Sequence, residues 1–196
     1  MEARVATERD LDLVAETLAA AFADDPLWGW AFPERDGLAR WWRFLVSSAL
    51  RYPWVWVAEE GAAASVWIPP GGVELTDAEE QRVEPLLREL IGERTPEVLE
   101  LLDRFERSHP DEVPHYYLSL LGTHPDHRGK GLGMALLAEG LERVDSERMP
   151  AYLESSNSAN DHRYERLGFS RVGGFTRPDE AVSVSTMWRE PAAERS

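Results

Sequence analysis

The sequence predicts an α/β fold in which helices flank a mixed β-sheet. Segments with apolar residues at spacings of three and four, typical of helices, occur together with short aromatic and aliphatic runs typical of strands. In the second half the two kinds alternate, which favours a sheet with its ligand at the strand ends. A chain of 196 residues is long enough for one hydrophobic core. We therefore expect a single domain over residues 1–190, followed by a polar tail over 191–196.

The first half predicts two helices and a hairpin. Thr7 and Asp10 form a capping box, which opens a helix whose apolar residues recur at helical spacing. A second helix is predicted over 38–48. Residues 54–58 and 63–68, separated by a short acidic turn, have the composition of two hairpin strands.

An acidic segment over residues 74–112 separates this hairpin from the next strand. It contains thirteen acidic residues and five arginines, a net charge of −8. Its periodicity predicts two surface helices over 76–90 and 96–107. We expect a helical insertion before the fourth strand.

The second half predicts four strands and two helices. Aromatic and aliphatic runs mark the strands, and apolar residues at helical spacing mark the first helix. Gly168 is placed to end the second helix. In chain order we expect a strand over 115–121, a helix from near Gly131, a strand over 151–155, a helix over 157–167, and strands near 169–172 and 182–188.

The composition excludes several classes of function. Thirty-six acidic and twenty-one basic residues give a net charge of −15 and a pI near 4.7. Such a surface repels nucleic-acid phosphates and attracts cationic ligands, amines included. We therefore expect no nucleic-acid partner, although acidic surfaces also serve solubility alone.

The cysteine and histidine content and the hydropathy exclude further kinds of site and cellular location. The chain has no cysteine, which excludes disulfides, thiolate catalysis and cysteine metal sites. His124 and His127 are three residues apart without a supporting ligand cluster, so we expect no metal; His109 and His162 are interpreted as isolated. No apolar run approaches the ~20 residues of a membrane span, and the first residues do not form a signal peptide. We expect a cytoplasmic protein without a membrane partner.

A glycine-rich loop joins the strand over 115–121 to the helix that follows. Gly129, Gly131 and Gly133 alternate with other residues, and glycines let the backbone approach a ligand closely. The amide groups at a helix start stabilise a phosphate, and Arg128 and Lys130 add positive charge. This pattern predicts a diphosphate site.

Two common nucleotide motifs do not fit this loop. A Walker P-loop requires a glycine where His124 stands and a serine or threonine where Gly131 stands. A dinucleotide fingerprint requires a third glycine at the position of Leu136. Both alternatives fail on these residues.

The loop resembles the coenzyme A pyrophosphate loop of the GNAT superfamily of N-acetyltransferases. The matching pattern is Arg128, two residues, Gly131, one residue and Gly133. In that family an asparagine on the following strand-helix junction contacts the pantetheine arm, and a tyrosine seven residues later lies near the sulfur. Asn157 and Tyr164 have this spacing, and Asn160 is a rival for the asparagine.

The resemblance is densest with the branch that contains puromycin N-acetyltransferase. It implies a mostly antiparallel sheet, acetyl-CoA as acyl donor and an amine acceptor. It also implies cofactor contacts from the loop, from Leu121 and Thr123 before it, and from the asparagines after it. The chain departs from that branch at Arg128, which is often glutamine in its members. The segments that carry the likeness are 115–118, 122, 125–127, 129–133, 153–154 and 164–169.

Acetyl transfer to an amine requires a base for the amine and an acid for the leaving thiolate. Without cysteine we expect direct transfer from donor to acceptor. Tyr164 is our candidate acid, and its alternative is a packing tyrosine at a helix end. Glu154, at the end of a strand beside the loop, is our candidate base, and its alternative is an acid without a catalytic role. Other base candidates are His115, Glu60 and Asp25.

The acceptor is expected to contact the connection between the first two helices. In the family this connection lines the acceptor pocket, and here it contains Asp25, Trp28 and Trp30; we add His115 from the strand. These residues favour a small, aromatic or antibiotic-like amine as substrate, and Asp25 either holds an ammonium or caps a helix. The alternatives are a protein N-terminal or lysine acetyltransferase, a non-catalytic acyl-CoA sensor or partner-binding module, and a nucleotide-using transferase. Monomer and homodimer stay open.

Overall fold

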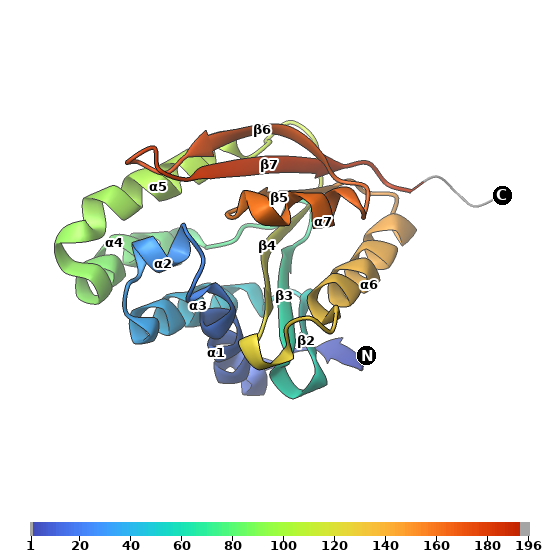
Figure 1. The fold of residues 1–196 in the computed structure, drawn as a ribbon, viewed down its shortest axis with the longest axis horizontal. Helices are drawn as coiled ribbons and strands as arrows, with labels where there is room; N and C mark the ends of the chain where they lie inside the picture. Colours follow the sequence, from blue (N-terminus) through green and yellow to red (C-terminus); the bar gives the residue numbers. More distant parts are fainter. Residues whose placement is uncertain (1, 193–196) are drawn as a thin grey trace.

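A computed structural model describes residues 2–192, and its centre is one seven-stranded sheet (Figure 1). The strand order is β1-β2-β3-β4-β5-β7-β6, and only the β4–β5 pair is parallel. The predicted mixed, mostly antiparallel sheet is therefore confirmed. The strands are β1 (Ala3–Val5), β2 (Val55–Ala58), β3 (Ala63–Ile68), β4 (Tyr116–Thr123), β5 (Ala151–Ser155), β6 (Ser170–Thr176) and β7 (Ser183–Arg189).

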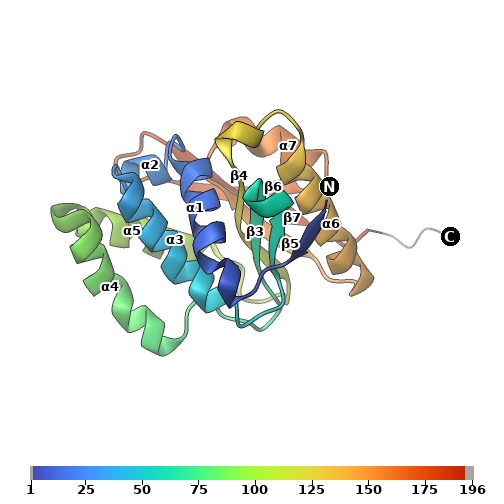
Figure 2. The ribbon, with the colours of Figure 1, turned by 90° about the horizontal axis from the view of Figure 1, so that it is seen from below.

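Helices cover both faces of the sheet (Figures 1 and 2). The helix pair α1–α3 packs on one face, and α6 packs on the other. Within residues 2–192, no helix has both the length and the hydropathy needed to cross a membrane. The helices are α1 (Leu11–Phe22), α2 (Trp28–Ala31), α3 (Arg35–Ala49), α4 (Asp77–Ile91), α5 (Thr95–Ser108), α6 (Leu132–Ser146) and α7 (Asp161–Glu165).

Two apolar layers hold these elements together. Under α1 and α3, Trp41 and Trp42 are almost completely buried, and the Trp42 ring meets Phe22 and Trp28 at centroid distances of 5.4 and 4.8 Å. Under α6, Trp67 and Leu137 are fully buried. Each such side chain contributes about 1.5–3 kcal/mol on burial, so both layers fix the helices against the sheet.

The sheet opens between its two central strands. β4 and β5 run parallel through the pairs Tyr116↔Ala151, Tyr117↔Tyr152 and Leu118↔Leu153, where the pairing ends. Beyond Leu118 and Leu153 the two halves of the sheet diverge, so that β5–β7–β6 runs across the half that contains β3 and β4 (Figure 1). The gap leaves backbone and side chains of both strands available to a ligand.

The acidic insertion forms the two predicted helices, α4 and α5, and is tied to α3 through Glu79. Thr76 and Glu79 form a capping box in which the Thr76 amide donates to Glu79 over 2.8 Å. From α3 and its end, the Ser48 hydroxyl donates to Glu79 over 2.7 Å, and Arg51 lies 3.2 Å away. Burial opposes ionisation, but these partners outweigh it and lower the pKa of Glu79 to about 2.

Because this pKa lies below its ordinary value of 4.5, ionised Glu79 contributes stability above about pH 4.5 that is lost as the pH falls through about 2. We expect Glu79→Gln to lower the unfolding free energy at pH 7 by about 2–3 kcal/mol. Urea denaturation of wild type and variant should give curves that converge near pH 2. Asp77→Asn, an exposed change in the same helical turn, is the control. An equal loss at pH 7 and pH 2 would contradict the assignment.

Candidate active site

A cleft of about 1340 Å³ lies where β4 and β5 diverge. One end is formed by the glycine-rich loop, the start of α6 and α7. The other end is formed by the acidic insertion, and the α1–α2 connection lies between the two ends, with Ala21 bonded to Arg128 of the loop and Trp28 stacked on Phe105 of α5. The cleft therefore joins the predicted diphosphate site to the predicted acceptor side.

The glycine loop adopts the conformation that its sequence predicts. Gly129 and Gly131 have φ of 80° and 75°, which glycine tolerates best. Gly131 precedes the first residue of α6, whose first turn contains no acidic residue. A Cβ at Gly133 would lie 2.4 Å from the Thr123 hydroxyl, so this glycine lets α6 approach the end of β4. The orphan amides of α6 are thus open to an anion.

Two arginines supply positive charge at this end of the cleft. Arg128 lies in the lining, where its guanidinium donates to the carbonyl oxygen of Ala21 over 2.9 Å, and Arg163 lines the cleft from α7. Among the described lining residues, these two are the only arginines or lysines. Leu121 lines the cleft too, whereas Lys130 does not. The role of Lys130 stays a prediction.

The predicted tyrosine faces the same end of the cleft from α7. Tyr164 packs against Phe169, and burial, helped by the charges of Asp25 and Asp161, raises its pKa to about 12. Its phenol is therefore protonated across the neutral and moderately alkaline range. That state is required of a proton donor.

Both predicted asparagines line the cleft between β5 and α7. The Asn157 side chain accepts a hydrogen bond from the Ala159 amide over 3.1 Å, so it caps the short turn that leads to α7. The Asn160 side chain has no such capping role. The choice between them as the pantetheine contact stays open.

Asp25 serves as a helix cap. One of its oxygens accepts from the amides of Leu27 and Trp28 at 2.9 and 3.0 Å, and the other accepts from Ser156 at 2.8 Å. Burial raises the pKa of Asp25 despite these bonds. The carboxylate therefore holds the α1–α2 connection against the β5 end, and its role toward an ammonium stays a prediction.

Glu154 is buried in the floor of the cleft. Its side chain is 2% exposed, and its Oε1 has no hydrogen-bond partner among the described residues. Strand alternation turns it to the face that also contains Tyr117 and Tyr152. Burial first, and then the Glu154 charge, raise the pKa of both phenols. An unpartnered buried carboxylate oxygen costs free energy, which a ligand proton would offset.

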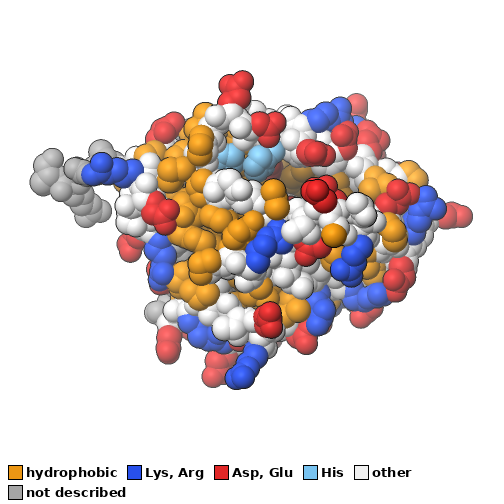
Figure 3. Space-filling model, turned by 180° about the vertical axis from the view of Figure 1, so that it is seen from behind, with side chains coloured by type: hydrophobic (Ala, Val, Ile, Leu, Met, Phe, Trp, Pro, Cys, Tyr) orange, Lys and Arg blue, Asp and Glu red, His pale blue; other side chains and the backbone are white. Residues whose placement is uncertain are grey.

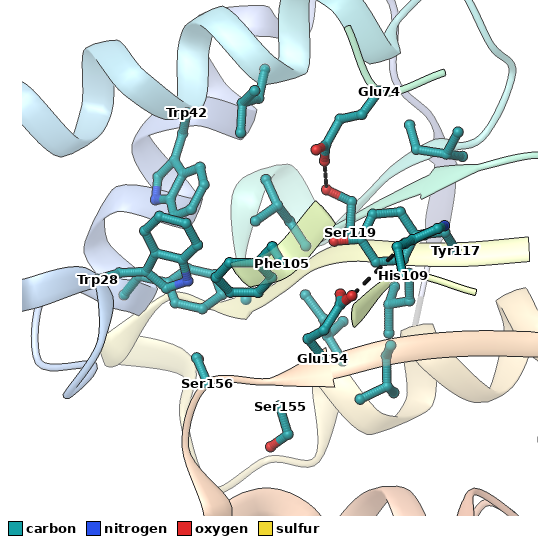
Figure 4. Close-up of a pocket in the computed structure, with 18 of the residues that line it drawn as sticks. Trp28, Trp42, Glu74, Phe105, His109, Tyr117, Ser119, Glu154, Ser155 and Ser156 are labelled. Carbon is teal, nitrogen blue, oxygen red and sulfur yellow. Dashed lines mark hydrogen bonds and ion pairs between the residues drawn. The ribbon is translucent and has the colours of Figure 1, made fainter. Parts of the chain in front are cut away.

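A second carboxylate lies across the cleft from Glu154 (Figure 4). Glu74 accepts a hydrogen bond from the Ser119 hydroxyl, and burial, together with the Glu154 charge, raises its pKa. The remaining wall is also acidic, since seven of the thirteen acids of the insertion line the cleft. They are Glu74, Glu80, Glu84, Asp103, Glu106, Asp111 and Glu112.

Aromatic rings form the wall beside these acids (Figure 4). Trp28 meets Trp42 edge to face and stacks on Phe105 at 5.7 Å. Phe105 in turn packs on Phe175 at 4.9 Å. Trp30 does not line the cleft, because it packs against two arginines of other elements. The predicted contact of Trp30 with the acceptor stays a prediction, and its side chain has no position in the cleft.

The interpretation of His109 as isolated is wrong. His109 caps the end of α5, lines the cleft, and places its Nδ1 3.8 Å from Glu154 Oε1. His115, predicted as an acceptor contact, lies beside it with the two Nε2 atoms 3.2 Å apart. The alternative base Glu60 lies in the β2–β3 turn, outside the cleft. No group of three metal-ligating side chains occurs within residues 2–192.

The model of the acetyltransferase (GNAT) family matches residues 20–169 of this sequence. Mycothiol acetyltransferase of Propionibacterium freudenreichii is 40% identical over 65 residues, which are 32% of this chain and 21% of that protein. The Streptomyces coelicolor protein of the same name is 30% identical over 121 residues, 58% of this chain and 38% of its own. The matched parts thus span less than half the length of these relatives.

Solved structures with the same fold cover nearly the whole chain. One described as histone acetyltransferase HPA2 and related acetyltransferase, from Corynebacterium glutamicum, has a TM-score of 0.68 at 26% identity and covers 99% of this chain and 98% of its own. Arylalkylamine N-acetyltransferase 2 of Aedes aegypti has a TM-score of 0.69 at 17% identity, covers 97% and 99%, and supports the fold alone. Fold and family match agree, and the chain belongs to the acetyltransferase (GNAT) family.

Proposed function

We propose that this protein transfers an acetyl group from acetyl-CoA directly to the primary amine of a small molecule with an aromatic or apolar body. The observation that carries the proposal is the single cleft across the divergence of β4 and β5. Its one end suits a diphosphate, and its other end is acidic and aromatic. The buried Glu154 and the protonated Tyr164 both line it.

The donor end fits coenzyme A by its own chemistry. Positive φ at Gly129 and Gly131, free amides at the start of α6 and two arginines are what a diphosphate requires. The edge of β4 beyond Leu118 is left unpaired by β5, so its backbone groups are available to an extended pantetheine arm. We assign donor contacts to Leu121, Thr123, Arg128, the loop glycines, Asn157 and Asn160.

The reaction that we derive uses two side chains. Glu154 takes a proton from the bound ammonium, and the nitrogen then forms a bond to the thioester carbonyl carbon. As the carbon–sulfur bond breaks, Tyr164 donates its proton to the departing sulfur and recovers one from the newly acylated nitrogen. The balance is one amide, one thiol and one net proton released. Because the chain has no cysteine, no acyl-cysteine step is available.

The acceptor side favours a cation attached to an apolar group. The seven acids of the insertion attract an ammonium electrostatically, and the rings of Trp28 and Phe105, which stack on each other, offer apolar surface or cation–π contact. This combination supports the puromycin N-acetyltransferase-like branch that the sequence resembles. The same proposal includes that the protein is cytoplasmic and acts as a monomer or homodimer.

Glu74 is proposed to hold the acceptor's positive charge. We expect Glu74→Gln to raise the KM for the amine about tenfold, because a hydrogen bond to a charged group contributes about 1.5–3 kcal/mol. The KM for acetyl-CoA should stay unchanged in steady-state kinetics. Glu97→Gln, an equal change of charge on the exposed side of α5 outside the cleft, is the control. Equal amine KM values in both variants would refute the role of Glu74.

The test of the function is incubation with acetyl-CoA and a panel of amines, with release of free thiol as the measurement. The panel contains arylalkylamines, aminonucleosides, polyamines and peptides with free N-termini or lysines. Fast turnover of the small aromatic amines supports the proposal, and peptide preference would favour a protein acetyltransferase. Acetyl-CoA binding without turnover of any amine would favour a sensor module. Thermal protection by ATP in place of acetyl-CoA would favour a nucleotide-using transferase.

A further inference from the structure

The proposed reaction leaves one proton on Glu154, a group almost completely shielded from water. The Glu154 side chain is 2% exposed, whereas the neighbouring His109 side chain is 31% exposed. Histidine side chains reach the surface beside a hollow on the face seen from behind (Figure 3). His109 is therefore the far more exposed member of the pair, and a proton passed to it from Glu154 lies on a side chain that solvent reaches.

The hydrogen bonds fix which ring nitrogens carry protons. His115 Nδ1 lies 2.6 Å from the carbonyl oxygen of Val113, so Nδ1 must be the donor. Burial lowers the pKa of His115, which keeps its ring neutral and leaves Nε2 as an acceptor. His109 Nε2, 3.2 Å away, must then donate to it. Neutral His109 is left with an unprotonated Nδ1, the nitrogen that faces Glu154 (Figure 4).

Two unprotonated acceptor atoms therefore face each other across 3.8 Å. Glu154 Oε1 has no hydrogen-bond partner among the described residues, and His109 Nδ1 is the ring nitrogen not used by His115. A proton on either atom converts this repulsive arrangement into a hydrogen bond. The pair is thus built to accept one proton and share it.

The groups around His109 are acidic and aromatic. The His109 backbone caps the end of α5, where the helix dipole is negative, and no Lys or Arg among the described residues lines this end of the cleft. The His109 ring packs edge to face on Tyr117 and Tyr152. The titratable groups that face the two histidines are Glu74 from the loop after β3, Asp111 from the loop after α5, Tyr117 from β4, and Tyr152 and Glu154 from β5.

We infer that His109 relays the acceptor's proton from Glu154 to solvent and that His115 orients His109 for this task. The inference rests on the proposed acetyl transfer. An ammonium N–H bond breaks as an O–H bond forms on Glu154; that bond breaks as an N–H bond forms on His109 Nδ1; water then takes the proton. His109 is a positioning residue in this scheme, since it acts on the acceptor's proton only through Glu154.

The activity test uses His109→Gln, which keeps a polar side chain that cannot relay a proton. We expect kcat to fall about 10- to 100-fold, less than the loss of a direct acid–base group, with unchanged KM for acetyl-CoA. Imidazole, added at constant pH and ionic strength, should restore turnover in proportion to its concentration. His162→Gln, at an exposed histidine outside the cleft, should neither lose activity nor respond. Wild-type kcat in His109→Gln, or a loss that imidazole does not restore, would overturn the relay.

Nuclear magnetic resonance of the ring nitrogens tests the arrangement without turnover. In ¹⁵N-histidine-labelled protein near neutral pH, His115 should carry its proton on Nδ1, and neutral His109 should carry its proton on Nε2. His115→Phe removes the nitrogen that accepts the hydrogen bond from His109 Nε2. Without it, neutral His109 should no longer prefer the tautomer with its proton on Nε2. A proton on Nδ1 of neutral His109 in the wild type would overturn the inference. If the tautomers are as expected but no amine of the panel is acetylated, the proposed function is rejected and the arrangement of the two histidines stands.

Discussion

Replacing Glu154 with glutamine is expected to lower kcat by about 10²- to 10⁴-fold, the usual contribution of a positioned acid–base group. Glutamine has nearly the same volume and fills the same buried site, but it cannot take a proton from the ammonium. Acetyl-CoA affinity should be unchanged, because the donor end of the cleft lies at the loop and α6. Steady-state kinetics with the best amine of the panel, together with calorimetric titration of acetyl-CoA, measures both.

The control for this variant is Glu165→Gln, an exposed acid on α7 outside the cleft. It should turn over like the wild type. If Glu154→Gln keeps turnover within a few-fold, Glu154 is not the base. The base would then have to be sought among the other groups of the cleft, Glu74, Asp25 and His115 first.

Replacing Tyr164 with phenylalanine is the second large effect that we expect. The variant loses the proton for the departing thiolate, so kcat should fall about 10²-fold or more, while acetyl-CoA affinity should change little. Because burial raises the pKa of Tyr164 to about 12, its phenol stays protonated up to at least pH 10. The wild-type pH–rate profile should therefore contain no loss of kcat below pH 10 that depends on Tyr164.

Tyr116→Phe is the matched control for this variant. Tyr116 lies outside the cleft, where its hydroxyl donates to Glu147 over 2.7 Å. Its loss should lower stability without lowering kcat. A Tyr164→Phe variant that turns over within a few-fold of wild type would make Tyr164 a packing tyrosine, with the thiolate protonated by water.

Much of the fold could be predicted because its elements are long and strongly patterned. The helices α1, α3, α4, α5 and α6 and the strands β2 to β7 lie where periodicity and composition place them. The sequence pattern does not predict β1 or α2, and the helix predicted over 157–167 is wrong in its length, since α7 has five residues and follows a short 3-10 turn. β1 has three residues and α2 has four, too few to show a period, and both form because tertiary neighbours hold them.

The candidate site divides in a similar way. The loop 128–133 and Tyr164 could be predicted because each lies in a contiguous motif whose spacing reflects local geometry. Glu74, Ser119 and His109 could not, because side-chain contacts of the insertion with β4 and β5 bring them together from distant parts of the chain. The sequence predicts α5 as a surface helix. Only the position of its end over the cleft, which the structure shows, brings His109 to Glu154.

The most direct test of the account is a crystal structure with coenzyme A bound. We predict the diphosphate against the amides of residues 129–133, the pantetheine arm along β4 beyond Leu118, and the sulfur beside the Tyr164 hydroxyl. The space between that sulfur and Glu154 should open toward Trp28 and Glu74. Coenzyme A bound elsewhere, or a sulfur on the far side of the cleft from Tyr164 and Glu154, would contradict the proposed site.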